Sequence, residues 1–127
     1  MGRWLAVAGL SGLIAIAIGA FGTHLLAGRL PPTSLSWIAT GTGYQMTHSL
    51  ALLGVALLAR ERAGRSATVE LAGWCFVVGI VLFCGSLYVL ALTGAGPVAW
   101  LTPVGGAAFM IGWAALARQG FILWRES

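Results

Sequence analysis

Residues 43–59 read GYQMTHSLALLGVALLA, and this stretch decides how the rest of the chain is interpreted. Its second part, residues 50–59, holds no charged or strongly polar side chain, whereas its first part gathers Tyr44, Gln45 and His48. In a soluble protein such polar groups are mostly exposed to water. Because these polar residues begin a long apolar segment, we expect that the segment lies in an environment other than water.

The amino-acid composition indicates which environment this is. Of the 127 residues, 59% are hydrophobic and only 8% are charged, and the mean hydropathy is +0.94. Ordinary soluble proteins carry roughly 25% charged residues, so the sequence indicates an integral membrane protein. The length accommodates about four spans of roughly 20 residues with short connections. We therefore expect one transmembrane domain over residues 1–127 and no separate soluble domain.

Gaps between charges and turn residues divide the chain into four apolar segments, all predicted to be helices of one compact, all-α four-helix bundle. They are residues 4–27, 43–59, 68–92 and 98–117. The polar stretch 31–42, PPTSLSWIATGT, is predicted to begin a helix that either lies at the interface or runs into the second span. A signal peptide is the alternative for the first segment, but that apolar run is long for one.

The arginines predict the orientation of the spans. Six of the seven fall at the N-terminus, the second connection and the C-terminus, and only Arg29 falls on the other side. Because positive residues are retained in the cytoplasm, both termini are expected to be cytoplasmic. The net charge of +4 is thus a topology signal, and no nucleic-acid partner is expected. The six are Arg3, Arg60, Arg62, Arg65, Arg118 and Arg125.

Tryptophans and small residues refine this arrangement. Trp4, Trp74 and Trp124 are predicted at the inner membrane interface and Trp37 and Trp100 at the outer one, while Trp113 falls within a span. Small residues recur along one side of three helices, which favours close helix packing in lipid. The stripes are Ala8, Gly12, Ala15, Gly19 and Gly22; Ala72, Cys75, Gly79, Leu82 and Ser86; and Thr102, Gly105, Ala108, Gly112 and Ala115.

Polar residues of all four helices are predicted to share one layer in the outer half of the membrane. With the spans given above, His24 lies near the outer end of the first helix and His48 near the outer start of the second. The third and fourth helices contribute residues from their outer ends. The candidate site residues are His24, Tyr44, Gln45, His48, Ser86, Tyr88, Thr102, Pro103, Gly105 and Gly106.

Two interpretations of this layer remain open. Hydrogen bonds between helices are common in membrane proteins and need no function beyond fixing the helices against one another. Alternatively, His24 and His48 contact a metal, haem iron or a quinone oxygen. Two histidines without a third ligand make a weak metal site, so zinc is the least favoured ligand and no metal is assigned.

Enzyme chemistry has little support in the sequence. No GxSxG, HExxH, Walker or dinucleotide motif is present, so no catalytic residue is assigned and no enzyme is expected. All three glutamates are predicted at the cytoplasmic side, which argues against proton-coupled export through an embedded carboxylate. Cys75 and Cys84 are nine residues apart on one helix and cannot form a disulfide.

Four strings in order resemble the signatures of the YgdD-like family, small bacterial inner-membrane proteins without an assigned activity. They are IGAFGTHLL (18–26), WIATGTGYQMTHSLALLGVAL (37–57), GIVLFCGSLYVLALTG (79–94) and LTPVGGAAFMIGW (101–113). The resemblance covers nearly the whole chain and implies a four-span protein of the bacterial inner membrane. The family's motif positions coincide with the polar layer, although Thr23 replaces a frequent alanine.

The sequence therefore predicts a structural or accessory component of the bacterial inner membrane. The alternative is a protein that binds haem, a quinone or a lipid at the outer-leaflet His/Tyr/Gln site. The lipid bilayer is the expected partner. A second membrane protein, or further copies of the chain, are the other candidate partners. Six arginines on one side favour parallel over dual-topology oligomers.

Overall fold

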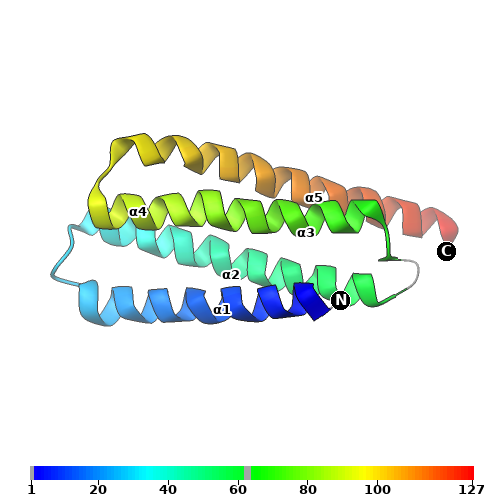
Figure 1. Cartoon of the computed structure of the whole chain (residues 1–127), viewed down its shortest axis with the longest axis horizontal. Coiled ribbons are helices and arrows are strands. Elements are labelled where there is room, and N and C mark those ends of the chain that lie inside the picture. Colours follow the sequence, from blue (N-terminus) through cyan, green and yellow to red (C-terminus); the bar gives the residue numbers. More distant parts are fainter. Residues whose placement is uncertain (1, 62–63) are drawn as a thin grey trace.

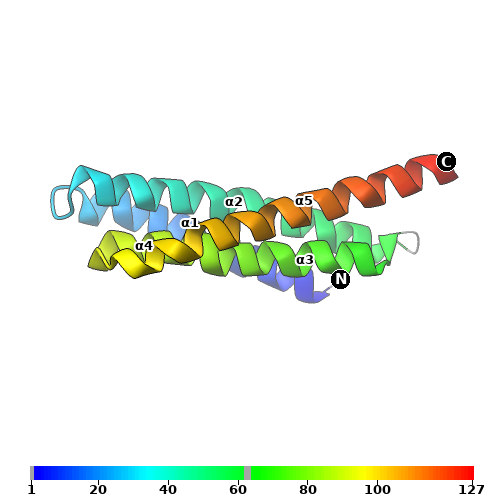
Figure 2. The same cartoon turned by 90° about the horizontal axis from the view of Figure 1, so that it is seen from above.

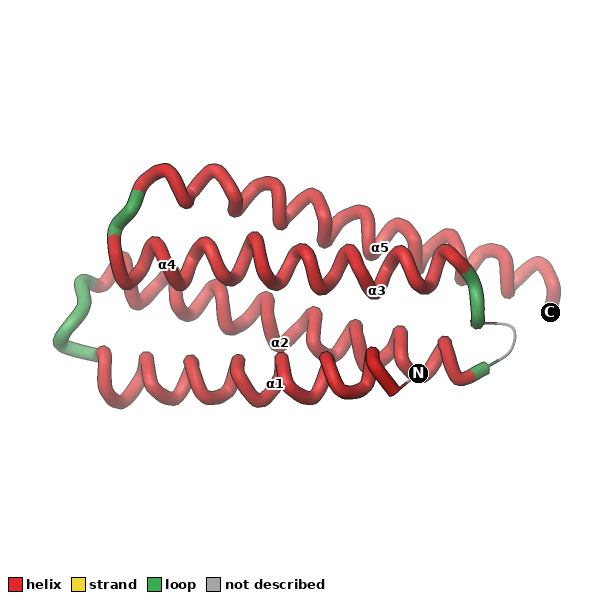
Figure 3. Tube along the Cα trace, viewed as in Figure 1, coloured by secondary structure: helices red, strands yellow, loops and turns green. Residues whose placement is uncertain are grey.

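The structure is a computed structural model that describes residues 2–61 and 64–127. Four helical rods run side by side and alternate in direction (Figures 1 and 3). The first is α1 (Gly2–Phe21) with the π-helix η1 (Gly22–Leu26), and the second is α2 (Pro32–Arg60). The third joins α3 (Ala67–Gly79), the π-helix η3 (Ile80–Cys84) and α4 (Gly85–Thr93). The fourth joins the 3-10 helix η4 (Gly96–Trp100) and α5 (Leu101–Glu126).

Short connections allow neighbouring helices to be antiparallel. The first and third connections each contain a glycine in the left-handed region, Gly28 at φ 83° and Gly94 at φ 65°. Gly94 ends α4 by donating its N–H to the carbonyl of Leu90 at 2.8 Å. A residue with a side chain is strained in this conformation, so these two glycines make the tight reversals possible.

Three of the rods combine the length and the apolar composition of a membrane span. Among the described residues, Gly2–Leu26, Ala67–Thr93 and Gly96–Glu126 are long and apolar enough to cross a bilayer. The rod formed by α2 is 29 residues long, but its first half is polar. The protein is therefore an all-helical membrane protein with three clear candidate spans and a fourth long helix packed among them.

The second helix begins at Pro32, within the polar stretch 31–42 where a helix start was expected and before the apolar segment 43–59. Pro32 occupies the first turn, where a missing N–H costs no hydrogen bond. The polar stretch continues as helix because its hydroxyls bond back to their own backbone, such as Thr42 to the Ala39 carbonyl at 3.1 Å. Of the two alternatives for this stretch, it runs into the second helix.

Glycines packed against aromatic rings form the contacts between the third and fourth rods. A side-chain carbon added at Gly112 would lie 2.6 Å from the ring of Phe76, and one at Gly79 would overlap the ring of Phe109. Gly105 lies against the backbone of Phe83 in the same way. The stripes of small residues thus lie at helix contacts, as expected from the sequence.

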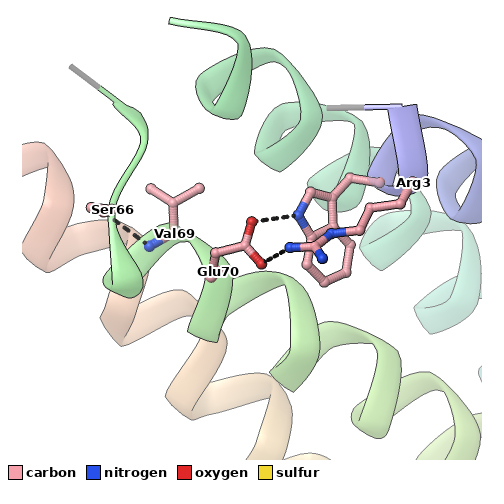
Figure 4. Close-up of polar contacts among 5 residues, drawn as sticks. Arg3, Ser66, Val69 and Glu70 are labelled. Atoms are coloured by element: carbon pink, nitrogen blue, oxygen red, sulfur yellow. Dashed lines mark hydrogen bonds and ion pairs between the residues drawn. The ribbon is translucent and has the colours of Figure 1, made fainter. Parts of the chain in front are cut away.

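The two ends of the chain, the last turn of α2 and the first turn of α3 lie toward the same end of the bundle (Figures 1 and 2). There Arg3 forms an ion pair with Glu70, whose carboxylate also accepts a hydrogen bond from Trp4 Nε1 at 3.2 Å (Figure 4). Ser66 caps the start of α3 by accepting from the Val69 N–H at 3.2 Å. Arg62, one of the six arginines used to predict the orientation, lies outside the described residues.

The structure corrects the expected role of Trp4. Its side chain is only 2% exposed, because the indole packs into the space left by Gly73 of α3. Trp4 is therefore part of the core and does not anchor the chain at the lipid interface. Trp74 and Trp124 are 54% and 74% exposed, as an interfacial position requires.

Candidate functional site

His48 lies inside the bundle with both ring nitrogens engaged. Its Nδ1 lies 2.7 Å from the Tyr44 carbonyl oxygen, and its Nε2 lies 3.1 Å from Nε1 of Trp113. An indole N–H only donates, so Nε2 accepts and Nδ1 carries the proton that goes to the Tyr44 carbonyl. The side chain is 3% exposed. His48 is thus held as one neutral tautomer with its hydrogen-bonding capacity used.

Aromatic rings surround this imidazole. The ring of Phe109 stacks on it with centroids 3.5 Å apart and planes at 10°, and Phe76 and Trp113 approach at 5.5 and 5.9 Å. Tyr44, one helical turn earlier, stacks parallel to His48 at 6.1 Å and meets Phe83 of η3 at 4.6 Å. The π-helix in the third rod brings Phe83 into this cluster.

Gln45 connects three of the four rods. Its Oε1 accepts from the hydroxyl of Tyr88 at 2.7 Å, and its Nε2 donates to the carbonyl oxygen of Ser11 at 3.1 Å. Ser49 bonds to the Ser11 hydroxyl and to the Gln45 carbonyl, both at 2.7 Å. Gln45 and Ser49 are each 4% exposed. This network joins α1, α2 and α4 through polar groups that have no water to bond.

The third and fourth rods carry the remaining candidate residues, toward the end where α4 connects to η4. The hydroxyl of Ser86 donates to the Phe83 carbonyl at 2.9 Å and lies 2.6 Å from that of Thr102. A hydroxyl has one proton, so Thr102 donates to Ser86. Pro103 lies in the first turn of α5, where it needs no N–H partner. Gly105 and Gly106 face Phe83, so their role is close packing.

His24 does not join His48, which corrects the prediction that the two lie at one depth. In the antiparallel pair of α1 and α2, Gly12 is opposite Ser49 and Gly19 is opposite Thr42. His48 is then displaced from His24 by about 11 positions, or about 17 Å, along the axis. The prediction failed because α2 starts at Pro32. The His24 side chain is exposed and makes no hydrogen bond or ring contact within the described chain.

A groove opens between α2 and α5 beside the His48 cluster. Its volume is about 890 Å³, and its lining is mainly apolar and aromatic. Tyr44 is 46% exposed along it, whereas His48 presents a ring whose nitrogens already have partners. The lining includes Tyr44, His48, Phe83, Pro103, Gly106 and Trp113.

The chemistry available in these sites is hydrogen bonding and aromatic packing. No group of three or more His, Cys, Asp or Glu side chains able to hold a metal occurs in the part of the chain that the structure describes. In the same part, every buried side-chain nitrogen or oxygen has a hydrogen-bond partner. The polar layer of the sequence prediction is thus resolved into two hydrogen-bonded groups and one aromatic cluster, with His24 apart.

Comparison with known proteins gives the family. The model of a family described as "Protein of unknown function (DUF423)" matches residues 18–106, which include all ten candidate site residues. The chain belongs to this family. It is 44% identical over 119 residues to a UPF0382 membrane protein of Haemophilus influenzae, covering 94% of each chain.

Two further relatives support membership of this family. The chain is 43% identical over 110 residues to the UPF0382 inner membrane protein YgdD of Escherichia coli, covering 87% of this chain and 82% of the relative. It is 44% identical over 104 residues to the UPF0382 membrane protein YwdK of Bacillus subtilis, covering 82% and 84%. The resemblance to the YgdD-like family is therefore confirmed. No solved structure matches the chain.

Sequence reasoning missed three residues that build the site. Trp113 donates a hydrogen bond to His48, and Phe109 stacks on the His48 ring. Ser11 forms hydrogen bonds with both Gln45 and Ser49. Trp113 carried a signal, because an indole N–H in mid-span needs an acceptor. Ser11 and Phe109 carried none, since a single serine and a phenylalanine are ordinary in an apolar helix.

Proposed function

We propose that the protein is a non-enzymatic structural or accessory component of the bacterial inner membrane. The observation that carries this proposal is the saturation of His48, whose two nitrogens bond to Tyr44 and Trp113. A catalytic or ligating imidazole needs a nitrogen to offer to a substrate or metal. The saturation of Gln45 by Ser11 and Tyr88 supports the same reading.

The proposed topology has four spans, with both termini in the cytoplasm. The pairing of α2 with α1 along their length supports a second span despite its polar first half. Hydroxyls bonded to their own helix and a buried Gln45 lower the cost of that half in lipid. The orientation is supported by the arginine bias at the end that holds both termini.

This topology is tested by labelling single cysteines in intact cells with a membrane-impermeant thiol reagent. Cys75 and Cys84 are first replaced by alanine, and a cysteine is then introduced at Gly96 or at Ser127. We expect labelling from outside at position 96 and not at 127. Labelling at both positions, or at 127 alone, would overturn the orientation.

A second candidate function rests on the groove between α2 and α5. Its aromatic lining and volume of about 890 Å³ fit a quinone ring or a lipid chain beside Tyr44. Haem fits less well, because iron would have to displace Trp113 from His48 and would not find His24 as a second ligand.

An absorption spectrum with metal and quinone analysis of gently purified protein separates the two functions. The proposal predicts no stoichiometric chromophore or metal, and a His48→Phe variant that is merely less stable. A stoichiometric quinone, haem or metal that disappears in this variant would establish the second function. The accessory role also implies a membrane partner or further copies of the chain, which cross-linking in the native membrane would capture.

A further inference from the structure

A second groove lies between the first turns of α3 and the middle turns of α5, toward the arginine-rich end of the bundle. Its volume is about 500 Å³. The walls are Ala67, Thr68 and Leu71 from α3 and Ile111, Ala114, Ala115 and Arg118 from α5. Small alanines leave the space, and Leu71 and Ile111 remain 50% and 52% exposed. The groove is therefore open to the lipid.

Arg118 marks the polar end of this groove. Its Nη1 donates to the hydroxyl of Thr68 at 2.8 Å, which holds the guanidinium at the level of the first turn of α3. No ion pair joins Arg118 to a carboxylate within the described residues. A guanidinium has five N–H donors, so most of them remain available to an anion.

The apolar part of the groove runs inward from this charge. Ile111 precedes Arg118 by seven residues on α5, which places it about 10 Å deeper along the helix. Leu71 of α3 lines the same inner part. A cation at the surface above an apolar channel matches a phospholipid, whose phosphate lies above its acyl chains.

The charge of the surrounding surface favours an anionic lipid. Among the described residues, five of the six arginines and the three glutamates lie toward this end of the bundle, and one of those glutamates, Glu70, is already paired with Arg3. The first groove, beside His48, lacks such a charge. Arginines at a membrane surface attract anionic headgroups.

We propose that one anionic phospholipid binds in the groove between α3 and α5, with its phosphate on Arg118 and an acyl chain along Leu71 and Ile111. This site requires helices that cross the bilayer, but it does not depend on which end faces the cytoplasm. It is also independent of whether the His48 cluster binds a ligand.

The test is native mass spectrometry of the full chain in detergent, titrated with phosphatidylglycerol or phosphatidylcholine. We expect one phosphatidylglycerol bound per chain and weaker binding of phosphatidylcholine. Arg118→Gln should weaken phosphatidylglycerol binding by about tenfold, the scale of one lost charge-assisted hydrogen bond. Arg125→Gln removes the same charge from the same helix outside the groove and should change binding by no more than about twofold.

A second pair of variants tests the apolar channel without changing charge. Ala114→Phe fills the groove and should also weaken binding about tenfold. Ala117→Phe, at an exposed position of the same helix that does not line the groove, should not. Ala114 is exposed, and circular dichroism of the variant checks that it folds. If Ala114→Phe is unfolded, Ile111→Trp fills the same space.

Three results would overturn the proposal. Equal losses in Arg118→Gln and Arg125→Gln would mean diffuse attraction without a site. Equal binding of phosphatidylcholine and phosphatidylglycerol would remove the role of charge. Competition by glycerol 3-phosphate at the concentration of the lipid would mean that a soluble phosphate, not a lipid, is the ligand.

Discussion

Trp113 Nε1 donates to His48 Nε2 at 3.1 Å, from α5 across to α2. This bond assigns the proton of the imidazole to Nδ1. Together with the stacking of Phe109 on His48 it joins α2 to α5 beside the groove. The bond lies in apolar and aromatic surroundings, where a lost partner is not replaced by water. A donor from the protein itself therefore satisfies Nε2 of this buried histidine.

Replacing Trp113 by phenylalanine should lower the free energy of unfolding by about 1–3 kcal/mol, since Nε2 of His48 loses its donor inside the bundle. Thermal unfolding in detergent measures the loss. Trp124→Phe is the control on the same helix, because Trp124 is 74% exposed and should change stability by less than about 0.5 kcal/mol.

The double variant His48→Phe with Trp113→Phe should cost less than the two single changes together, because both polar partners are then removed. Strict additivity would show that the two side chains do not interact and would contradict the assigned bond.

Removing the polar group of Gln45 should also lower the free energy of unfolding. Gln45→Met keeps the side-chain volume but leaves the Tyr88 hydroxyl and the Ser11 carbonyl without this partner, and a loss of about 1–3 kcal/mol is expected. Thr47→Val is the matched control on the same helix, because the Thr47 hydroxyl bonds only to Gly43 of its own helix and is exposed. Equal effects of the two changes would argue against a network between rods.

Glycine packing predicts a contrast within the third rod. Gly79→Ala places a methyl group against the ring of Phe109, which cannot move freely because it stacks on His48. We expect a loss of about 1–3 kcal/mol from overpacking. At Gly85 nothing lies within 4 Å of an added carbon, so Gly85→Ala should be neutral or stabilising by up to about 1 kcal/mol. The reverse order would mean that the third and fourth rods pack differently.

The cluster of Arg3, Trp4 and Glu70 allows the stability contribution of an exposed ion pair to be compared with that of a buried ring. The Arg3 and Glu70 side chains are 59% and 39% exposed, so Arg3→Gln should cost less than about 1 kcal/mol and less still at high salt. Trp4→Ala should cost about 3–5 kcal/mol, because the indole is 2% exposed and fills the space beside Gly73. Comparable losses would mean that the ion pair, and not the packing, holds α1 to α3.

Much of the fold could be predicted from the sequence, because the apolar segments are long and the breaks between them hold glycine, proline or arginine. The third helix was placed at 68–92 and runs from Ala67 to Thr93. The sequence left open whether residues 31–42 run into the second helix, since the hydroxyls of residues 33–47 look too polar for lipid. Their bonds to backbone and buried partners depend on tertiary contacts that hydropathy does not report.

The candidate site was predicted in part. Gln45, His48, Ser86, Tyr88 and Thr102 all take part in buried or half-buried hydrogen bonds, as their polar character in a span suggested. Their partners could not be read from spacing, because Ser11 and Trp113 lie on other helices. The pairing of His24 with His48 failed because the depth of His48 was counted from residue 43, whereas the helix begins at Pro32 and every depth along it shifts accordingly.

The most direct test of the account is nitrogen NMR of the His48 imidazole in ¹⁵N-histidine-labelled protein, with His24→Gln to leave one histidine. The account predicts a neutral ring with the proton on Nδ1 and with Nε2 as a hydrogen-bond acceptor, and a change of the Nε2 signal in Trp113→Phe. A proton on Nε2, or a nitrogen signal shifted by bound metal or haem, would contradict a saturated, structural His48.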